Sequence, residues 1–133
     1  MKLFVDTSAW FALNSSTDQN HAAAIEFIKT FQRHAVILYT TDYIVDETVT
    51  LIRVKVSHKQ AINFLNSALR SKNVIRSQVS RDLIMRAEQI FRKYSDKLWS
   101  YTDCVSFAFM DAQGLSDAFA FDQNFSQYGK SVH

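Results

Sequence analysis

Hydrophobic and polar positions along the chain predict short strands separated by amphipathic helices. The runs 2–5 (KLFV), 36–41 (VILYTT) and 118–121 (AFAF) are apolar or β-branched, as is typical of buried strands, and 74–79 (VIRSQV) indicates another short strand. Apolar residues recur every three or four positions over 21–33, 42–55, 58–70 and 80–95, which predicts helices. Ser8 can cap the turn after the first strand, Thr41 or Asp42 can cap the 42–55 helix, and Phe91 falls on the buried face of the 80–95 helix. A further helix follows, with Thr102 as its cap and Gly114 at its end.

Length and composition limit the fold. With 133 residues, of which 47% are hydrophobic, the chain is long enough for one domain, expected over residues 1–133. Two Gly and no Pro leave little turn chemistry, which favours a helix-rich α/β or an all-α fold. The single cysteine, Cys104, cannot form an internal disulfide and is expected in the core. The lack of a disulfide is typical of a protein in a reducing compartment.

The amino-terminal segment and the apolar runs bear on location. The first apolar run is interrupted at Asp6, before a signal sequence could form, and no later run approaches the ~18 residues of a membrane span. We therefore expect a cytoplasmic protein without a membrane partner.

Four carboxylates occur at positions where the local pattern would bury them or place them at the end of a sheet. Asp6 and Asp122 each end a predicted strand, and in open α/β sheets ligands bind beyond the carboxyl ends of the strands. Glu47 shares the apolar stripe of the 42–55 helix, whereas Asp46 turns toward solvent. Asp103, in the first turn of its helix, shares the inward face with two apolar residues, Phe107 and Met110.

Such a set of acids predicts a metal site. An isolated buried carboxylate is costly, and several crowded together repel one another unless a cation is bound. Each acid also has a simpler interpretation: Glu47 as a partly exposed partner of a Lys or Arg, Asp103 as a complement to the helix dipole, and Asp6 and Asp122 as turn residues.

Positive charge is concentrated in the second half of the chain. Residues 53–97 contain eleven of the fifteen Lys and Arg residues against three acids, a balance of +8, which leaves −6 for the remainder. Such a segment is either a set of solvated helix faces or, beside a cation-filled cleft, a surface for a phosphodiester chain. Arg86, Gln89 and Lys93 share one face of the 80–95 helix and are the candidates for contacts with an RNA backbone.

The segments VDTSAW, TTDYIVDETVTL, SYTDCVSFAFM and AFAFDQNF, in this order, resemble the motifs of PIN-domain proteins, particularly the VapC-like toxin ribonucleases. The resemblance implies a parallel sheet sandwiched between helices and RNA cleavage with Mg²⁺ or Mn²⁺. It also implies that Asp6, Glu47, Asp103 and Asp122 are the catalytic, metal-binding acids, with Thr7 or Ser8 as polar support. Family members often have Thr and His near the last acid, where this chain has Ala120 and Asn124.

The same resemblance implies a biological role. VapC-like proteins are toxins of type II toxin–antitoxin systems, usually homodimers, whose cognate antitoxin blocks the active site. On this hypothesis Asp6 and Asp103 hold the principal ion, while Glu47 and Asp122 complete its shell or orient water. Two alternatives remain: a PIN scaffold that binds RNA or a protein without catalysis, and a haloacid-dehalogenase-like phosphatase, whose DxDxT motif would need an Asp at Ser8.

Overall fold

A computed structural model describes residues 1–32 and 34–133. In chain order its elements are β1 (Lys2–Val5), α1 (Thr7–Asn14), α2 (His21–Lys29), η1 (Thr30–Gln32), β2 (Ile37–Thr41), α3 (Asp42–Lys55), α4 (His58–Asn66), η2 (Ala68–Arg70), β3 (Val74–Ser77), α5 (Arg81–Lys93), α6 (Tyr101–Gln113), β4 (Asp117–Phe119), α7 (Asn124–Gln127) and β5 (Ser131–Val132).

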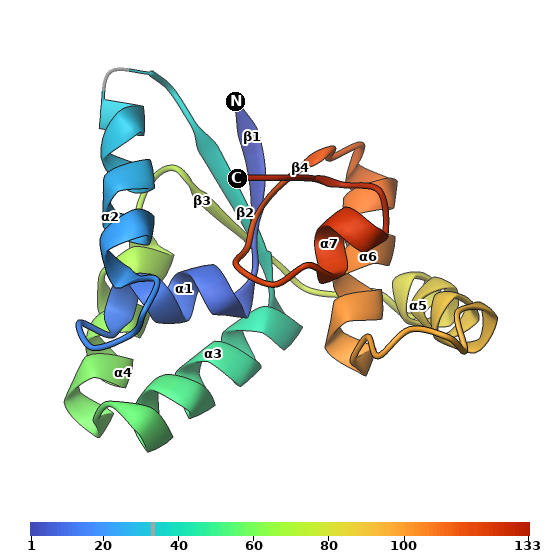
Figure 1. The fold of residues 1–133 in the computed structure, drawn as a ribbon, viewed down its shortest axis with the longest axis horizontal. Helices are drawn as coiled ribbons and strands as arrows, with labels where there is room; N and C mark the ends of the chain where they lie inside the picture. Colours follow the sequence, from blue (N-terminus) through green and yellow to red (C-terminus); the bar gives the residue numbers. More distant parts are fainter. Residues whose placement is uncertain (33) are drawn as a thin grey trace.

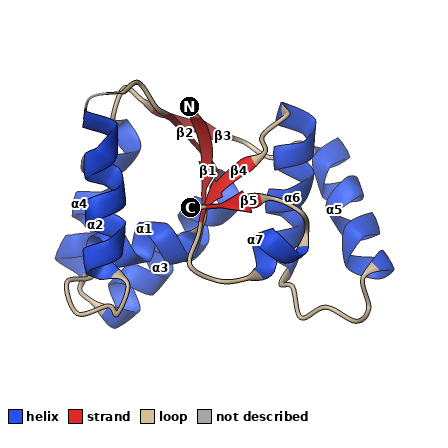
Figure 2. Ribbon diagram, turned by 45° about the horizontal axis from the view of Figure 1, so that its top comes forward, coloured by secondary structure: helices blue, strands red, loops and turns tan. Residues whose placement is uncertain are grey.

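The five strands form one sheet in the order β3-β2-β1-β4-β5, and every neighbouring pair is parallel. Parallel strands require crossover connections, and here helices provide most of them. Helices α1, α2 and α4 lie on one side of the sheet and α5, α6 and α7 on the other (Figures 1 and 2). This arrangement confirms the α/β/α fold expected from the sequence.

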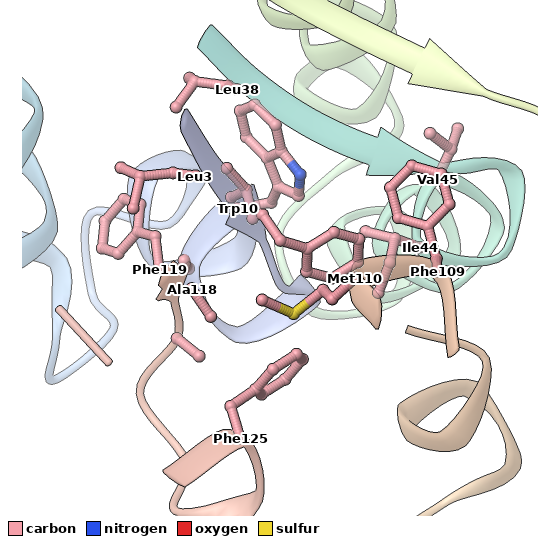
Figure 3. Close-up of a cluster of buried hydrophobic side chains, with 14 of the residues drawn as sticks. Leu3, Trp10, Leu38, Ile44, Val45, Phe109, Met110, Ala118, Phe119 and Phe125 are labelled. Atoms are coloured by element: carbon pink, nitrogen blue, oxygen red, sulfur yellow. The ribbon is translucent and has the colours of Figure 1, made fainter. Parts of the chain in front are cut away.

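The core lies on both faces of the central strand. Leu3, Phe4 and Val5 of β1 are completely buried, as is typical of a strand covered by helices on both faces. Figure 3 shows side chains from β1, β2 and β4 together with side chains from the helices on either side. In α6 every residue from Cys104 to Met110 is buried, because this helix lies between the sheet and α5. The prediction of a core position for Cys104 is therefore confirmed.

Side-chain caps define where the helices begin. Thr41 caps α3, as predicted, and Gly114 ends α6 with φ 66°, a left-handed conformation that favours glycine. Two predicted caps are wrong. Asp6, not Ser8, caps α1, and Ser100, not Thr102, caps α6.

Several boundaries differ from the sequence-based prediction. The predicted helix 21–33 ends at Lys29 and continues as η1, and residue 33 lies outside the described residues. The predicted helix 58–70 is divided into α4 and η2, while α7 and β5 were not predicted, since four and two residues are too short for a periodic signal. Phe91, predicted to be buried, is 51% exposed. Across the described part of the chain, no helix is long and apolar enough to span a bilayer.

Candidate functional site

Two of the predicted acids lie at the edge of the sheet where the strands end. Asp6 directly follows β1, and its backbone N–H donates to the Phe119 carbonyl at the end of β4, at 3.0 Å. Asp122 follows β4 after two residues. The first turns of α3 and α6 lie at this same end of the molecule (Figure 1). All four predicted acids therefore come from segments that start or end near one edge.

Asp6 is buried, with 4% of its surface exposed. Its Oδ2 accepts hydrogen bonds from the Ser8 backbone N–H at 3.2 Å and from the Ser8 hydroxyl at 2.7 Å. The pKa of Asp6 is raised from 3.8 to about 7, mainly by burial and also by the charges of Asp122 and Asp103, while the Ser8 hydrogen bonds oppose the rise. The pKa shows that three of the acids affect one another electrostatically.

The two polar residues after Asp6 connect it to neighbouring segments. The Ser8 hydroxyl donates to Asp6 and accepts from the Phe121 backbone N–H at 3.0 Å, so it links Asp6 to the loop that contains Asp122. Thr7 is buried, and its hydroxyl accepts a hydrogen bond from Thr48 of α3 at 3.2 Å. Ser8 thus contacts Asp6 directly, whereas the Thr7 hydroxyl is hydrogen-bonded to α3.

Asp103 is held by a capping box at the start of α6. Its backbone N–H donates to the Ser100 hydroxyl at 3.0 Å, and its Oδ2 accepts from the Ser100 backbone N–H at 2.9 Å. The same Oδ2 accepts from the Asn124 side-chain amide at 3.0 Å. Burial raises the pKa of Asp103 despite these bonds, and the charges of Asp122 and Glu47 add to the rise.

Asn124 connects two of the acids. Its side-chain amide donates to Asp103, and its backbone N–H donates to Asp122 Oδ1 at 3.0 Å. The sequence singled this position out only as a departure from a pattern that often has His there. Asn124 thus supplies a hydrogen-bond donor to Asp103, although it is not the histidine often found at this position.

Glu47 lies differently from the prediction. Its side chain is exposed rather than buried on the apolar stripe of α3, although Thr48 and Ile44 beside it are buried. It lines a cavity of about 720 Å³ whose other walls are Thr7, Asp42, Tyr43, Asp46, Thr50, Leu51 and Thr102. Asp46 is exposed as predicted, but it lines the same cavity. Glu47 is therefore a wall of an open cavity that is also lined by Thr7 and Thr102, the chain neighbours of Asp6 and Asp103.

The four predicted acids lack basic partners among residues 1–32 and 34–133. The ion pairs within this described part of the chain involve other acids: Glu88, Asp96, Asp111 and Asp117. A buried carboxylate such as Asp6 normally needs a positive partner, and oxygen ligands are those that hard divalent cations prefer. The donor set therefore fits a divalent cation.

The same residues do not form a tight cluster. Nowhere in the described chain do three His, Cys, Asp or Glu side chains converge as closely as the ligands of one ion. The charges of the neighbouring acids nevertheless raise the pKa of Asp6 and that of Asp103. A looser arrangement is compatible with Mg²⁺, which usually retains several waters and is held by only one or two carboxylates.

The predicted basic row lies on another part of the surface. Arg86, Gln89 and Lys93 are exposed and line a hollow with Asp111 and Tyr128. Asp111 is eight residues after Asp103 on α6, which corresponds to about 12 Å along the helix. The row is therefore separate from the acids, in a hollow between α5, the later turns of α6 and Tyr128.

The sequence reasoning did not identify every residue of this region. Ser100, Asn124 and the cavity residues Asp42 and Tyr43 were not proposed. The signal for Ser100 was present, since Ser-x-x-Asp before an apolar run is a capping-box pattern. Asp42 Oδ1 accepts from the backbone N–H groups of Tyr43 and Val79, each at 3.1 Å, contacts that no local pattern indicates.

The family model of the PIN domain matches residues 3–131. The chain therefore belongs to the PIN-domain family, whose nucleases generally use divalent metal ions. This membership confirms the family suggested by the four motifs and argues against the haloacid-dehalogenase-like alternative.

A curated relative is more specific. The chain is 31% identical over 128 residues to the 23S rRNA-specific endonuclease VapC20 of Mycobacterium tuberculosis, which covers 96% of this chain and 94% of that protein. The crystal structure of Mycobacterium tuberculosis VapC20, described as a Sarcin-Ricin loop cleaving toxin, superimposes with a TM-score of 0.87 at 30% identity, covering 96% of this chain and 95% of the other.

Two more distant structures share the fold. VapBC2 from Rickettsia felis, bound to a DNA fragment from its promoter, matches with a TM-score of 0.75 at 7% identity, over 100% of this chain and 98% of the other. FitAcB from Neisseria gonorrhoeae matches with a TM-score of 0.67 at 15% identity, over 99% of this chain and 96% of the other. At these identities the likeness concerns the fold alone.

Proposed function

We propose that this protein is a divalent-metal-dependent endoribonuclease and the toxin component of a type II toxin–antitoxin system. The observation that supports this most strongly is the group of acids at the carboxyl edge of the sheet, with raised pKa values for Asp6 and Asp103 and no basic partners in the described chain. Similarity to the 23S rRNA-specific endonuclease VapC20 over 96% of the chain supports RNA as the substrate class.

The proposed cofactor is Mg²⁺ or Mn²⁺. Asp6 and Asp103 would hold the principal ion, and Glu47 and Asp122 would complete its shell or orient a water. When bound, such an ion lowers the pKa of a coordinated water and offsets charge on the phosphate. Ser8 holds the Asp6 carboxylate in position, and Ser100 and Asn124 hold that of Asp103, so both acids are oriented by the chain itself.

The catalytic proposal is tested by Asp103→Asn. Amide and carboxylate are nearly isosteric, but only the carboxylate supplies the charge that a hard cation requires, so RNA cleavage should fall to background while the circular dichroism spectrum is unchanged. Asp82→Asn, an exposed acid on α5, is the matched control and should cleave as the wild type does. Full activity of Asp103→Asn, in a preparation free of contaminating nuclease, would overturn the assignment. Absence of metal-dependent cleavage by the wild type would favour the non-catalytic RNA- or protein-binding scaffold.

We further propose that Arg86, Gln89 and Lys93 contact the RNA backbone. All three are exposed on one face of α5, and phosphate contacts release counterions. Arg86→Ala and Lys93→Ala should each weaken binding to unrelated RNA sequences equally and reduce the salt slope by about 0.7 for a single strand. Lys29→Ala, exposed on α2, is the control. If the slope stays the same in both variants, these residues belong to a solvated face.

The proposed partners are a cognate antitoxin and a second copy of the chain, in the cytoplasm. The structural neighbours VapBC2 and FitAcB support this proposal through the fold they share with this chain. Co-expression with the product of a small adjacent upstream reading frame should yield a complex that no longer cleaves RNA. Size-exclusion chromatography with light scattering measures whether the isolated chain is a dimer.

A further inference from the structure

Three aromatic side chains form a row at the surface beside the acids. The rings of Tyr43 on α3 and Tyr101 on α6 are close to parallel, at 26°, with centroids 6.4 Å apart. The ring of Phe91 on α5 lies 6.5 Å from Tyr101 on the other side. We call Tyr43, Tyr101 and Phe91 the aromatic row. It joins the two helices that contain Glu47 and Asp103.

The row is open to solvent. Phe91 is 51% exposed and Tyr101 is 40% exposed. Tyr43 is half-buried and lines the cavity of about 720 Å³ together with Glu47 and Thr102. Adjacent exposed aromatic rings leave apolar surface in contact with water. Such patches mark binding surfaces more often than isolated exposed residues do. The row therefore requires an explanation that core packing does not supply.

Its position relative to the acids indicates the ligand. Tyr43 precedes Glu47 by one helical turn, and Tyr101 precedes Asp103 by two residues. Tyr43 lines the same cavity as Glu47 and Thr102, so a molecule held on the row would border the proposed catalytic site. This is where the nucleotides next to a scissile phosphate would have to lie.

The hydroxyl of Tyr101 is connected to an exposed ion pair on α5. The Tyr101 hydroxyl donates to Glu88 Oε2 at 2.8 Å, and Glu88 in turn pairs with Arg92 at 3.6 Å. The hydrogen bond to Glu88 raises the pKa of the Tyr101 hydroxyl, so the phenol stays neutral and its ring is oriented from α5. The Arg92 side chain is 73% exposed, which leaves its positive charge accessible to a phosphate beside the row.

We propose that the aromatic row is a stacking site for unpaired RNA bases flanking the scissile phosphate. This inference rests on the proposed ribonuclease function and adds the residues of this chain that would hold the bases. Such rings need accessible base faces, as in an RNA loop or single strand. Aromatic side chains stack on bases of any sequence, and each such contact changes affinity on the order of tenfold. In a continuous A-form duplex the base faces are covered by their neighbours, so the row would reject it.

The test measures binding of two RNA probes by fluorescence anisotropy. One probe is an unstructured oligonucleotide containing 2-aminopurine, and the other is the same sequence annealed to its complement. Measurements are made with Mg²⁺ in an Asp6→Asn background, so that the RNA survives. Tyr101→Ala and Phe91→Ala should each weaken single-strand binding about tenfold and reduce the quenching of 2-aminopurine, with duplex binding changed less than twofold.

Two control variants separate stacking from other effects. Tyr101→Phe keeps the ring and removes the hydroxyl, so binding and quenching should stay within about twofold of the background protein. Leu98→Ala removes a fully exposed apolar side chain of the α5–α6 loop, which lies outside the row, and should have no effect. Circular dichroism of each variant checks that the fold is retained.

The inference is overturned by any of three results: single-strand binding unchanged in both alanine variants, equal loss for single strand and duplex, or loss of antitoxin binding with RNA binding intact. The last result would make the row a protein-docking surface. The proposed function fails separately. If the wild type stacks 2-aminopurine on the row but cleaves no RNA, the nuclease proposal fails and the row is left as an RNA-binding surface without a scissile phosphate beside it.

Discussion

Asp6 is the acid with the strongest electrostatic constraint, because it is buried next to other carboxylates. The pattern of the sequence was sufficient to place it, since a short apolar run ended by Asp puts the carboxylate at the carboxyl edge of a parallel sheet. The same reasoning failed for Glu47. Helical periodicity assigns a residue to a stripe, but it does not show where the sheet beneath the helix ends. At Glu47 the stripe faces a cavity, so the side chain is exposed.

The raised pKa of Asp6 predicts how stability depends on pH without a cation. Its folded-state pKa of about 7 exceeds the ordinary value of 3.8, so between these two pH values the folded protein binds more protons than the unfolded chain. The free energy of unfolding should therefore fall as pH rises through this window. In the presence of a chelator, the melting temperature of the wild type should fall more between pH 5 and pH 7.5 than that of Asp6→Asn, because the asparagine has no charge to desolvate. Identical losses would contradict the buried, ionisable state of Asp6.

At the scale of single elements, the helix caps show why some helix starts were predicted correctly from the sequence and others were not. Thr41 was predicted as a cap because a β-branched strand ends there and an amphipathic stripe begins. The cap of α6 was placed two residues too late, since both Ser100 and Thr102 have suitable side chains and only tertiary packing selects between them. Phe91 was misplaced because α5 lies outside α6, away from the sheet (Figure 2), so it has less apolar surface to pack against.

The capping box of α6 provides a test of how an element positions an acid. Ser100→Ala removes a cap and should cost about 1 kcal/mol, or about 3–4 °C in melting temperature. The Ser100 hydroxyl accepts from the Asp103 backbone N–H, so its loss should loosen the first turn of α6 that positions the Asp103 carboxylate, although the bond from the Ser100 backbone N–H to that carboxylate is kept. The dissociation constant for Mn²⁺ should therefore rise about tenfold in calorimetry. Ser57→Ala removes the equivalent cap of α4 and is the matched control: the same loss of stability with unchanged Mn²⁺ affinity. Equal Mn²⁺ affinity in both variants would show that the cap does not orient Asp103.

For the molecule as a whole, the order of the segments along the chain was predictable, but their convergence was not derivable from local patterns. The parallel order β3-β2-β1-β4-β5 places β1 between β2 and β4, so segments from opposite ends of the chain meet at one edge. The resemblance to PIN-domain proteins implied a parallel sheet sandwiched between helices, but not this order of its strands. The aromatic row could not be foreseen, because its three residues come from three helices whose relative placement depends on the complete fold.

The central claim is that the four acids form one discrete cation site, and the most direct test is the melting temperature with and without Mg²⁺ or Mn²⁺. A cation at ten times its dissociation constant stabilises the folded state by about 1.4 kcal/mol. For a chain of 133 residues this predicts a gain of about 5 °C.

The gain should shrink in Asp6→Asn and Asp103→Asn. Asp46→Asn would be a weaker control than the sequence suggested, because Asp46 lines the same cavity as Glu47, so Asp82→Asn takes its place. A full gain in Asp82→Asn with a reduced gain in the other two supports the account, and equal gains in all three variants would contradict it.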